Sequence, residues 1–231
     1  MKYHLLFSVL IILLGSCGII EKSSRHDFQT GFYNYSSNFV QHQKVYVESG
    51  EKIIAYPIQG KIAAKEPLFD ISLQGSDSVC LAPIKFSKNS LDIDFTTVLF
   101  KFRPSIYHLP AQLNTDFNAS IYAGWRHDNY YLRIKSDPKG QCSNTLVNRG
   151  YDFGLFAGPG GTTVGPFSTR NAVSNEYNGF IIQYGLAGFL ESNMASFGIS
   201  AGMDRLFSPD NKYWIYRNKP WIGFMVGIAL N

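Results

Sequence analysis

From about residue 91 to the end, the chain alternates between large apolar side chains and small or polar ones. The final stretch, PWIGFMVGIALN, shows this most clearly: every second side chain from Ile222 to Leu230 is large and apolar, and those between are mostly small. Successive side chains of a β-strand point to opposite faces of its sheet. The alternation predicts eight strands, over 92–103, 117–127, 129–136, 150–158, 162–167, 177–190, 194–206 and 220–231.

The connections between these stretches alternate in length. Short turns are expected at 127–129, 159–161 and 192–193, and long loops at 104–116, 137–149, 168–176 and 207–219. An even number of antiparallel strands, with short turns at one end and long loops at the other, is typical of outer-membrane barrels. Closure also leaves no unpaired strand edge in lipid. We therefore expect an all-β, antiparallel transmembrane β-barrel of about eight strands over residues 91–231.

The segment before residue 91 lacks a sustained apolar face. Lys44–Ile58 has the pattern of a hairpin with a Ser49-Gly50 turn, and Leu68–Leu73 has that of a further strand. Residues 18–90 are therefore expected to form a tether followed by a small periplasmic β-rich segment.

The first 17 residues have the pattern of an export signal. A ten-residue, mainly apolar run from Leu5 to Leu14 is too short to span a bilayer but fits a signal peptide. Leu14-Gly15-Ser16-Cys17 resembles the lipobox of bacterial lipoproteins. That resemblance implies lipid attachment at Cys17, and Gly18 after it favours the outer membrane. The alternative is an ordinary signal peptide that is cut nearby, with Cys17 incidental.

Residues 91–231 as a whole resemble the small eight-stranded outer-membrane barrels of the OmpA/OmpX type. The resemblance rests on the strand and loop pattern and on the amphipathic C-terminal strand. It implies a location in the bacterial outer membrane and contact with outer-membrane lipid. It also implies a structural or surface-interaction role, with long loops available to an extracellular ligand.

Composition agrees with an envelope protein. Only 16% of the 231 residues are charged, against a usual ~25%, while 15% are aromatic and 21 are glycine. The net charge of +4 is small and scattered, so nucleic acid is not an expected partner. Metal-binding and phosphate-binding motifs such as C-x-x-C, H-E-x-x-H and G-x-x-x-x-G-K-[ST] are missing from the sequence. We therefore expect no metal and no cofactor.

Several charged residues occupy the positions opposite the apolar ones and are expected in the barrel lumen. They are Lys101, Arg103, Arg126, Arg133, Lys135, Asp152 and Asp204. Because buried charges need partners, we expect them to form a plug of ion pairs and hydrogen bonds. A narrow polar pore or a proton path is the alternative.

Catalysis is not expected. Ser105 and Asp116 flank His108 in a predicted long loop, but no G-x-S-x-G motif accompanies them. His127 lies in a predicted turn at the opposite end, so the two histidines should not share a site. An outer-membrane enzyme that hydrolyses or transfers lipid acyl chains is the alternative.

Aromatic residues gather near predicted strand ends: Tyr107, Tyr213, Trp214, Tyr216 and Trp221. They are expected to form an interfacial girdle, and a glycan-binding platform is the alternative. Cys80 and Cys142 are expected at opposite ends of the barrel and should not pair. A lipid-anchored soluble β-sandwich that binds glycan or protein is the main alternative for the whole protein.

Overall fold

The computed structural model describes residues 28–38, 40, 42–60, 62–72, 83–136, 142–191 and 196–228. The protein is all-β, with 72% strand and 5% helix, and its 12 strands form one antiparallel sheet. The strands are β1 Gly31–Ser37, β2 Gln43–Ser49, β3 Lys52–Gln59, β4 Ile62–Ala63, β5 Phe69–Ser72, β6 Ile84–Arg103, β7 Gln112–Asn114, β8 Ala119–Ser136, β9 Cys142–Val164, β10 Tyr177–Glu191, β11 Ser196–Leu206 and β12 Pro220–Ile228. The predicted all-β, antiparallel class is confirmed.

Six of these strands form a closed ring. Strands β6, β8, β9, β10, β11 and β12 are neighbours in that order. Strand β12 also pairs with β6, from Ile222 opposite Phe102 to Ile228 opposite Phe95, which returns the hydrogen bonding to its start. The prediction of eight strands is therefore wrong for the ring.

Two predicted turns account for the difference. At residues 127–129 the chain continues as β8, and the pairing of Asp128 with Gly150 of β9 and Lys88 of β6 is uninterrupted. At residues 159–161 the chain continues as β9, paired with β10. Pro159 has no N–H to donate, but it is tolerated because the β8–β9 pairing already ends at Ile121 opposite Ala157.

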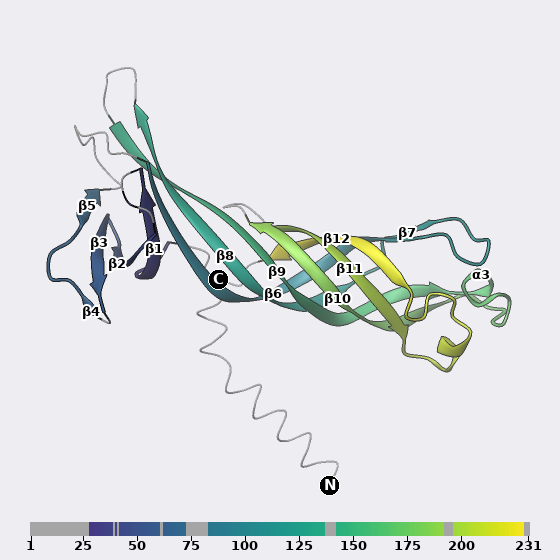
Figure 1. The fold of residues 1–231 in the computed structure, drawn as a ribbon. Coiled ribbons are helices and arrows are strands. Elements are labelled where there is room, and N and C mark those ends of the chain that lie inside the picture. The colour runs from purple at the N-terminus through teal and green to yellow at the C-terminus, as the bar shows by residue number, and fades with distance from the viewer. Residues whose placement is uncertain are drawn as a thin grey trace, which may run out of the picture.

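The predicted loop over 137–149 is also mostly strand, since β9 begins at Cys142. Strands β6, β8 and β9 therefore extend well beyond the ring (Figure 1). The boundary expected at residues 90 and 91 falls inside β6, so the two predicted domains share continuous strands.

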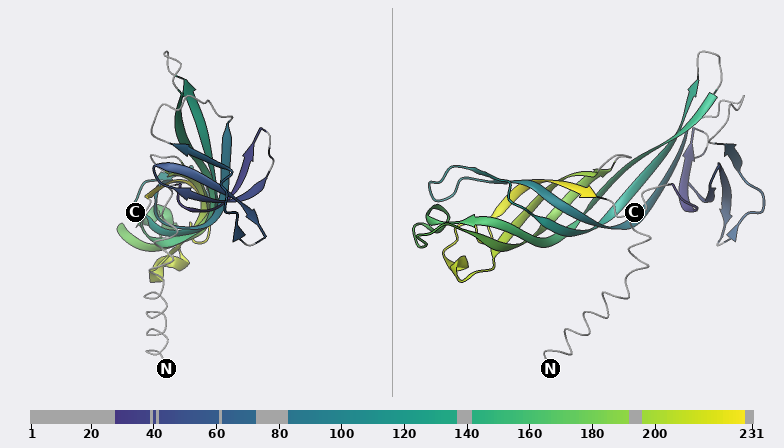
Figure 2. Two further views of the ribbon diagram at one scale, coloured as in Figure 1. Left: turned by 90° about the vertical axis from the view of Figure 1, so that its left-hand side faces the viewer. Right: turned by 180° about the vertical axis from the view of Figure 1, so that it is seen from behind.

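The extended strands combine with β1–β5 into a second structural unit. We call it the N-terminal unit: β1–β5 together with residues 84–90 of β6, 128–136 of β8 and 142–150 of β9. Strand β1 pairs with β6, and the predicted hairpin is present as β2 and β3. A core of aromatic and branched side chains fills this unit, including Tyr33, Val45, Ile53, Phe86 and Tyr130. Figure 2 shows the ring and the N-terminal unit joined end to end.

The far end of the ring carries the long connections. The connections from β6 to β8, from β9 to β10 and from β11 to β12 all lie there, and they include β7, the short helix α3 (Pro166–Thr169) and the 3-10 helix η1 (Pro209–Lys212) (Figure 1). The β8–β9 hairpin points the other way. No helix in the described part of the chain is long and apolar enough to span a membrane.

Candidate functional site

The outer surface of the ring is covered by large apolar side chains. Strand β11 shows the pattern without exception: exposed and buried residues alternate along all 11 positions, with Phe197 and Ile199 outside and Ser200 and Asp204 inside. We call the exposed apolar residues of the ring strands the apolar band. It consists of Leu91, Phe95, Leu99, Phe100, Phe102, Ile121, Trp125, Tyr151, Phe153, Leu155, Phe180, Ile182, Tyr184, Leu186, Leu190, Phe197, Ile199, Met203 and Ile222.

One strand departs from the expected alternation. A strict alternation along 92–103 would turn Val98 outward with Phe100, but Val98 is buried inside the ring. Opposite the consecutive residues Phe224 and Met225, β6 places Phe100 and Val98, so Leu99 is the extra residue of a β-bulge. The bulge turns Leu99 and Phe100 both outward and restores Lys101 to the inside.

The interior of the ring is filled by side chains. Its apolar part is a cluster of Val98, Tyr122, Phe156, Ala187, Phe189, Trp221 and Met225. Inward glycines make room for the large rings: a Cβ atom added to Gly202 would lie 2.6 Å from the Trp221 ring, and one added to Gly198 would lie 2.6 Å from the Phe189 ring. A ring of only six strands leaves little internal space. A large aromatic side chain therefore fits only where the facing residue is a glycine, which has no side chain.

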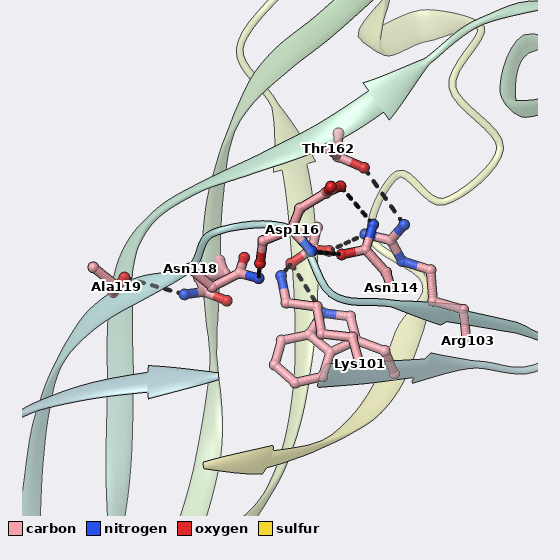
Figure 3. Close-up of polar contacts among 10 residues, drawn as sticks. Lys101, Arg103, Asn114, Asp116, Asn118, Ala119 and Thr162 are labelled. Carbon is pink, nitrogen blue, oxygen red and sulfur yellow. Dashed lines mark hydrogen bonds and ion pairs between the residues drawn. The ribbon is translucent and has the colours of Figure 1, made fainter. Parts of the chain in front are cut away.

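A buried ion-pair cluster lies inside the ring toward the loop end. Asp204 accepts from Lys101 Nζ at 2.9 Å on Oδ1 and from Arg103 Nη2 at 2.6 Å on Oδ2. The indole N–H of Trp221 also donates to Oδ1, at 2.9 Å. One carboxylate thus contacts two buried cations and an indole, and Figure 3 shows where the two cations, Lys101 and Arg103, lie. Because all three charges are nearly inaccessible to water, each depends on its partners for solvation.

Aromatic side chains complete this cluster. The Arg103 guanidinium lies 4.8 Å from the Tyr216 ring centroid and 5.5 Å from that of Trp214, and Lys101 Nζ lies 4.7 Å from that of Trp221. The expectation of an interfacial girdle is therefore wrong for Trp214, Tyr216 and Trp221, which are all buried. Trp214 and Tyr216 pack in a buried apolar cluster with Val164, Ile181 and Leu206, and Trp221 packs in the apolar part of the ring interior. The buried cations lie over their ring faces, where desolvation strengthens the attraction.

Strand β7 brings further polar groups to the same end. It pairs with residues 101–103 of β6, where β8 no longer reaches. Asn114 Nδ2 donates to Asp116 Oδ2 at 2.8 Å, and Asn118 Nδ2 donates to the Asp116 carbonyl at 2.5 Å. Figure 3 shows these side chains beside Lys101 and Arg103.

A second polar group lies toward the N-terminal unit. Arg126 Nε donates to Asp128 Oδ1 at 2.9 Å, and Arg126 Nη1 lies 3.7 Å from Asp92 Oδ2. The Tyr122 hydroxyl donates to Asp152. The sequence-based prediction omitted Asp92, although the alternation in LDIDFT places it, with Asp94, opposite outward apolar residues.

Of the seven residues predicted to face the lumen, the structure places five inside: Lys101, Arg103, Arg126, Asp152 and Asp204 are all buried. Arg133 is instead exposed, and the prediction of a lumen position is wrong for it. It lies on the part of β8 that continues past the ring, where a separate strand over 129–136 was expected. Lys135 lies on the same extension, and its side chain is outside the described residues.

The residues considered for catalysis do not form a connected set. The Ser105 hydroxyl donates to the Leu109 carbonyl at 2.6 Å, while the carboxylate of Asp116 accepts from Asn114. Among the described residues, no hydrogen bond joins His108 to either of them. His127 Nδ1 lies 2.6 Å from Asn89 Oδ1, at the opposite end of the ring.

Of the three cysteines, the structure describes only Cys142. Cys17 and Cys80, like the expected signal peptide, lie outside the described residues. Cys142 starts β9 at the tip of the β8–β9 hairpin, opposite Ser136. The expectation that it lies in a loop at the far end from the N-terminal segment is wrong, because that loop is replaced by the extended strands.

Among the described residues, no group of three or more His, Cys, Asp or Glu side chains is arranged to hold a metal ion. Comparison of the chain with protein families, curated proteins and solved structures finds no match. Functional inference therefore rests on the geometry of the ring.

Proposed function

We propose that the ring is a transmembrane β-barrel of the bacterial outer membrane and that the protein has a structural or surface-interaction role there. The observation that carries this proposal is the inverted placement of side chains, with the apolar band outside and the charged residues inside a closed ring. Closure pairs the backbone N–H and C=O groups that an open sheet would leave free at its edges, and a sheet in lipid requires this pairing.

The size of the apolar band favours lipid over water as its surroundings. Soluble monomers rarely expose a contiguous apolar patch larger than a few hundred Å², whereas this band occupies all six strands of the ring. The strand lengths also suit a bilayer, since β10, β11 and β12 have 15, 11 and 9 residues and a tilted strand needs ~9–11 to cross.

The filled interior supports a structural or surface role over a pore. Six strands are fewer than the eight of the smallest usual outer-membrane barrels, so the lumen is correspondingly narrow. Ion pairs around Asp204 and the aromatic cluster occupy it.

The loop end offers a surface for an extracellular partner. Five aromatic side chains of the described connections are exposed there: Tyr107, Phe117, Phe167, Phe207 and Tyr213. In the proposed orientation this end faces outward, while the N-terminal unit lies in the periplasm and Cys17 carries a lipid anchor.

The two alternatives from the sequence fit less well. A soluble sandwich would bury its apolar side chains between layers and turn charges outward, which is the reverse of the ring. A lipid acyl hydrolase would need Ser105, His108 and Asp116 to act together, and their hydrogen bonds lead to other groups.

Membrane insertion can be tested without the lipid anchor. The Cys17→Ser chain should be folded with phosphatidylcholine vesicles and run on a gel with and without boiling. A barrel should migrate faster before boiling, because the folded ring resists dodecyl sulfate. A protein that stays in the aqueous phase and shows one mobility would refute the proposal.

A tryptophan measurement locates the band directly. Of the three tryptophans, only Trp125 is in the apolar band, while Trp214 and Trp221 are buried. In a Trp214→Phe, Trp221→Phe variant, brominated acyl chains should quench the remaining fluorescence strongly. The matched Trp125→Phe variant should be quenched much less, because its two indoles face inward.

A further inference from the structure

A strip of positive charge lies on the outer surface just beyond the apolar band, on the N-terminal unit. Strand pairing sets its side chains in four rows across β9, β8 and β6. The rows are Tyr151, His127 and Asn89; Arg149, Asn129 and Ser87; Val147, Tyr131 and Lys85; and Thr145 with Arg133. The first row adjoins Trp125 and Leu91 of the band.

Three cations share this face: Lys85, Arg133 and Arg149. Each stands an even number of residues from an outward member of the band on its own strand, so all three point outward. Arg133 and Arg149 are exposed, and Lys85 Nζ lies 5.6 Å from the Tyr131 ring centroid. We call these three residues the basic strip.

Carboxylates do not neutralise the basic strip within these rows, since none of the side chains in the four rows is acidic. The nearby aspartates Asp92, Asp128 and Asp152 are buried on the opposite, inner face. Among the described residues, these rows therefore carry three positive charges and no negative one where the proposed bilayer surface would lie.

A groove on the same strands lies further into the apolar band. Small outward residues at Ala123 and Ala157 leave a hollow of about 620 Å³ between Ile121, Leu155 and Leu186, and the backbone of Gly185 also lines it. The hollow lies on β8, β9 and β10, and the first two of these strands also carry the basic strip.

The spacing suits a phospholipid. Six residues separate Arg149 from Leu155 on β9, which is about 20 Å along a strand. At a tilt of ~40° this is a rise of about 15 Å, or half of a ~30 Å hydrocarbon core. An acyl chain reaching the middle of the bilayer would therefore end in the groove while its phosphate contacts the strip.

We propose that the basic strip and the groove together bind an anionic glycerophospholipid of the periplasmic leaflet. The inference rests on the proposed membrane location. Charge complementarity selects the headgroup, since lysine and arginine side chains next to a membrane favour anionic lipids. The apolar groove selects a lipid over a soluble phosphate.

The test uses the Cys17→Ser chain, purified in neutral detergent and titrated with phosphatidylglycerol or phosphatidylcholine. Native mass spectrometry counts the lipids that each chain retains. The wild-type residues should retain phosphatidylglycerol preferentially. The triple variant Lys85→Gln, Arg133→Gln, Arg149→Gln should bind phosphatidylglycerol at least tenfold more weakly and should lose the preference for it over phosphatidylcholine. The matched control is the triple variant Lys65→Gln, Lys212→Gln, Lys219→Gln, which removes three exposed charges elsewhere on the protein. This control should keep the preference for phosphatidylglycerol.

A groove variant separates the two halves of the site. Ala157→Phe should reduce retention of both lipids, because it fills the hollow and leaves the strip intact. If the triple strip variant fails to fold, as judged by gel mobility before boiling, the double variant Arg133→Gln, Arg149→Gln serves instead, since both residues are exposed.

Two outcomes would overturn the inference. Equal retention of the two lipids by a chain that still inserts in phosphatidylcholine vesicles would refute the lipid site and leave the barrel proposal intact. A lipid-free dimer that is lost in Ala157→Phe would show that a second copy of the chain occupies the groove. Failure to insert at all would instead refute the proposed function.

Discussion

The ring and the N-terminal unit share three strands, β6, β8 and β9, but these strands turn different side chains inward in the two regions. In β8, Arg126 and Asp128 face inward at the ring end, whereas Tyr130 and Leu132 face inward two and four positions later. The outward face of β8 changes in the opposite sense, from apolar at Trp125 in the apolar band to charged at Arg133 in the basic strip. A sheet therefore does not fix which of its faces is apolar, and one continuous strand can change it.

The reversal occurs at one level on all three strands. It falls near Ser90 in β6, near His127 in β8 and near Gly150 in β9, which the pairing places close to one another. A membrane surface at this level would explain it: water surrounds the N-terminal unit and hydrocarbon surrounds the ring.

Removing the carboxylate of Asp204 should damage the ring most. Asp204→Ala leaves Lys101 and Arg103 buried without their shared partner, which should cost about 3–5 kcal/mol of unfolding free energy. The readout is the temperature at which the fast-migrating gel form is lost. The control Asp70→Asn breaks the exposed Lys52–Asp70 pair of the N-terminal unit, with an expected cost of about 0–1 kcal/mol. Equal effects would contradict a dry ring interior.

A charge placed in the apolar band should be the next most costly change. Ile199→Arg should destabilise the vesicle-folded protein by about 2–4 kcal/mol, because the residue faces the proposed bilayer. Urea unfolding from vesicles measures it. Ile62 of the N-terminal unit is similarly exposed, so Ile62→Arg should have little effect if water surrounds that unit. A tolerated arginine at position 199 would count against a lipid-facing surface.

Filling the space opposite Trp221 should have a moderate effect. Gly202→Ala places a Cβ 2.6 Å from the Trp221 ring and 2.9 Å from the Tyr184 carbonyl oxygen, so overpacking should cost about 1–3 kcal/mol. In Gly161→Ala the nearest atom is 3.9 Å away, and the cost should be small. Thermal loss of the fast-migrating form again reports the difference. A neutral Gly202→Ala would show that the Trp221 ring can move away from position 202, and thus that the ring interior is loosely packed.

The smallest effect is expected at high pH in the N-terminal unit. Burial raises the pKa of Tyr33 from 10.0 to about 12, with a lowering contribution from its hydrogen bond to Gln29 and a further raising one from Asp128. The folded state thus retains the proton longer than the unfolded state. The resulting stability is fully present below pH 10 and is lost as pH rises toward 12.

Near-ultraviolet circular dichroism of the full chain at pH 9 to 12 follows this loss. Tyr33→Phe should flatten that part of the pH dependence, although it also removes the hydrogen bond to the Gln29 carbonyl and lowers stability at neutral pH. An unchanged pH profile in Tyr33→Phe would mean that other groups cause the loss.

The sequence predicted the facing of individual residues well within each strand. Lys101, Arg103, Arg126, Asp152 and Asp204 were expected inside the ring and are buried. It failed at Val98, because the β-bulge at Leu99 shifts which residues face inward, and the apolar residues on both sides of it give no sign of this shift in the sequence. It failed at Trp214 and Trp221 because strand-end aromatics suit a girdle and a cation cluster equally well.

Turn signals misled for a related reason. The polar triplet at 127–129 looks like a turn, but in β8 it marks the level at which the inward and outward faces exchange character. The Pro-Gly-Gly of 159–161 also looks like a turn, but it lies where the continuous pairing of β9 with β8 has ended and an isolated bridge between Asn118 and Gly160 follows. Local composition shows that the environment of a strand changes at these positions. The pairing with other strands determines whether the chain turns there or continues.

The sequence by itself determined the all-β class and the two faces of each strand, because side-chain alternation has a period of two residues and is a local property. Only the tertiary structure decided that six strands close the ring and that three of them continue into the N-terminal unit. Those features depend on pairing between residues far apart in the chain, and a strand's own pattern of apolar residues does not name its partner.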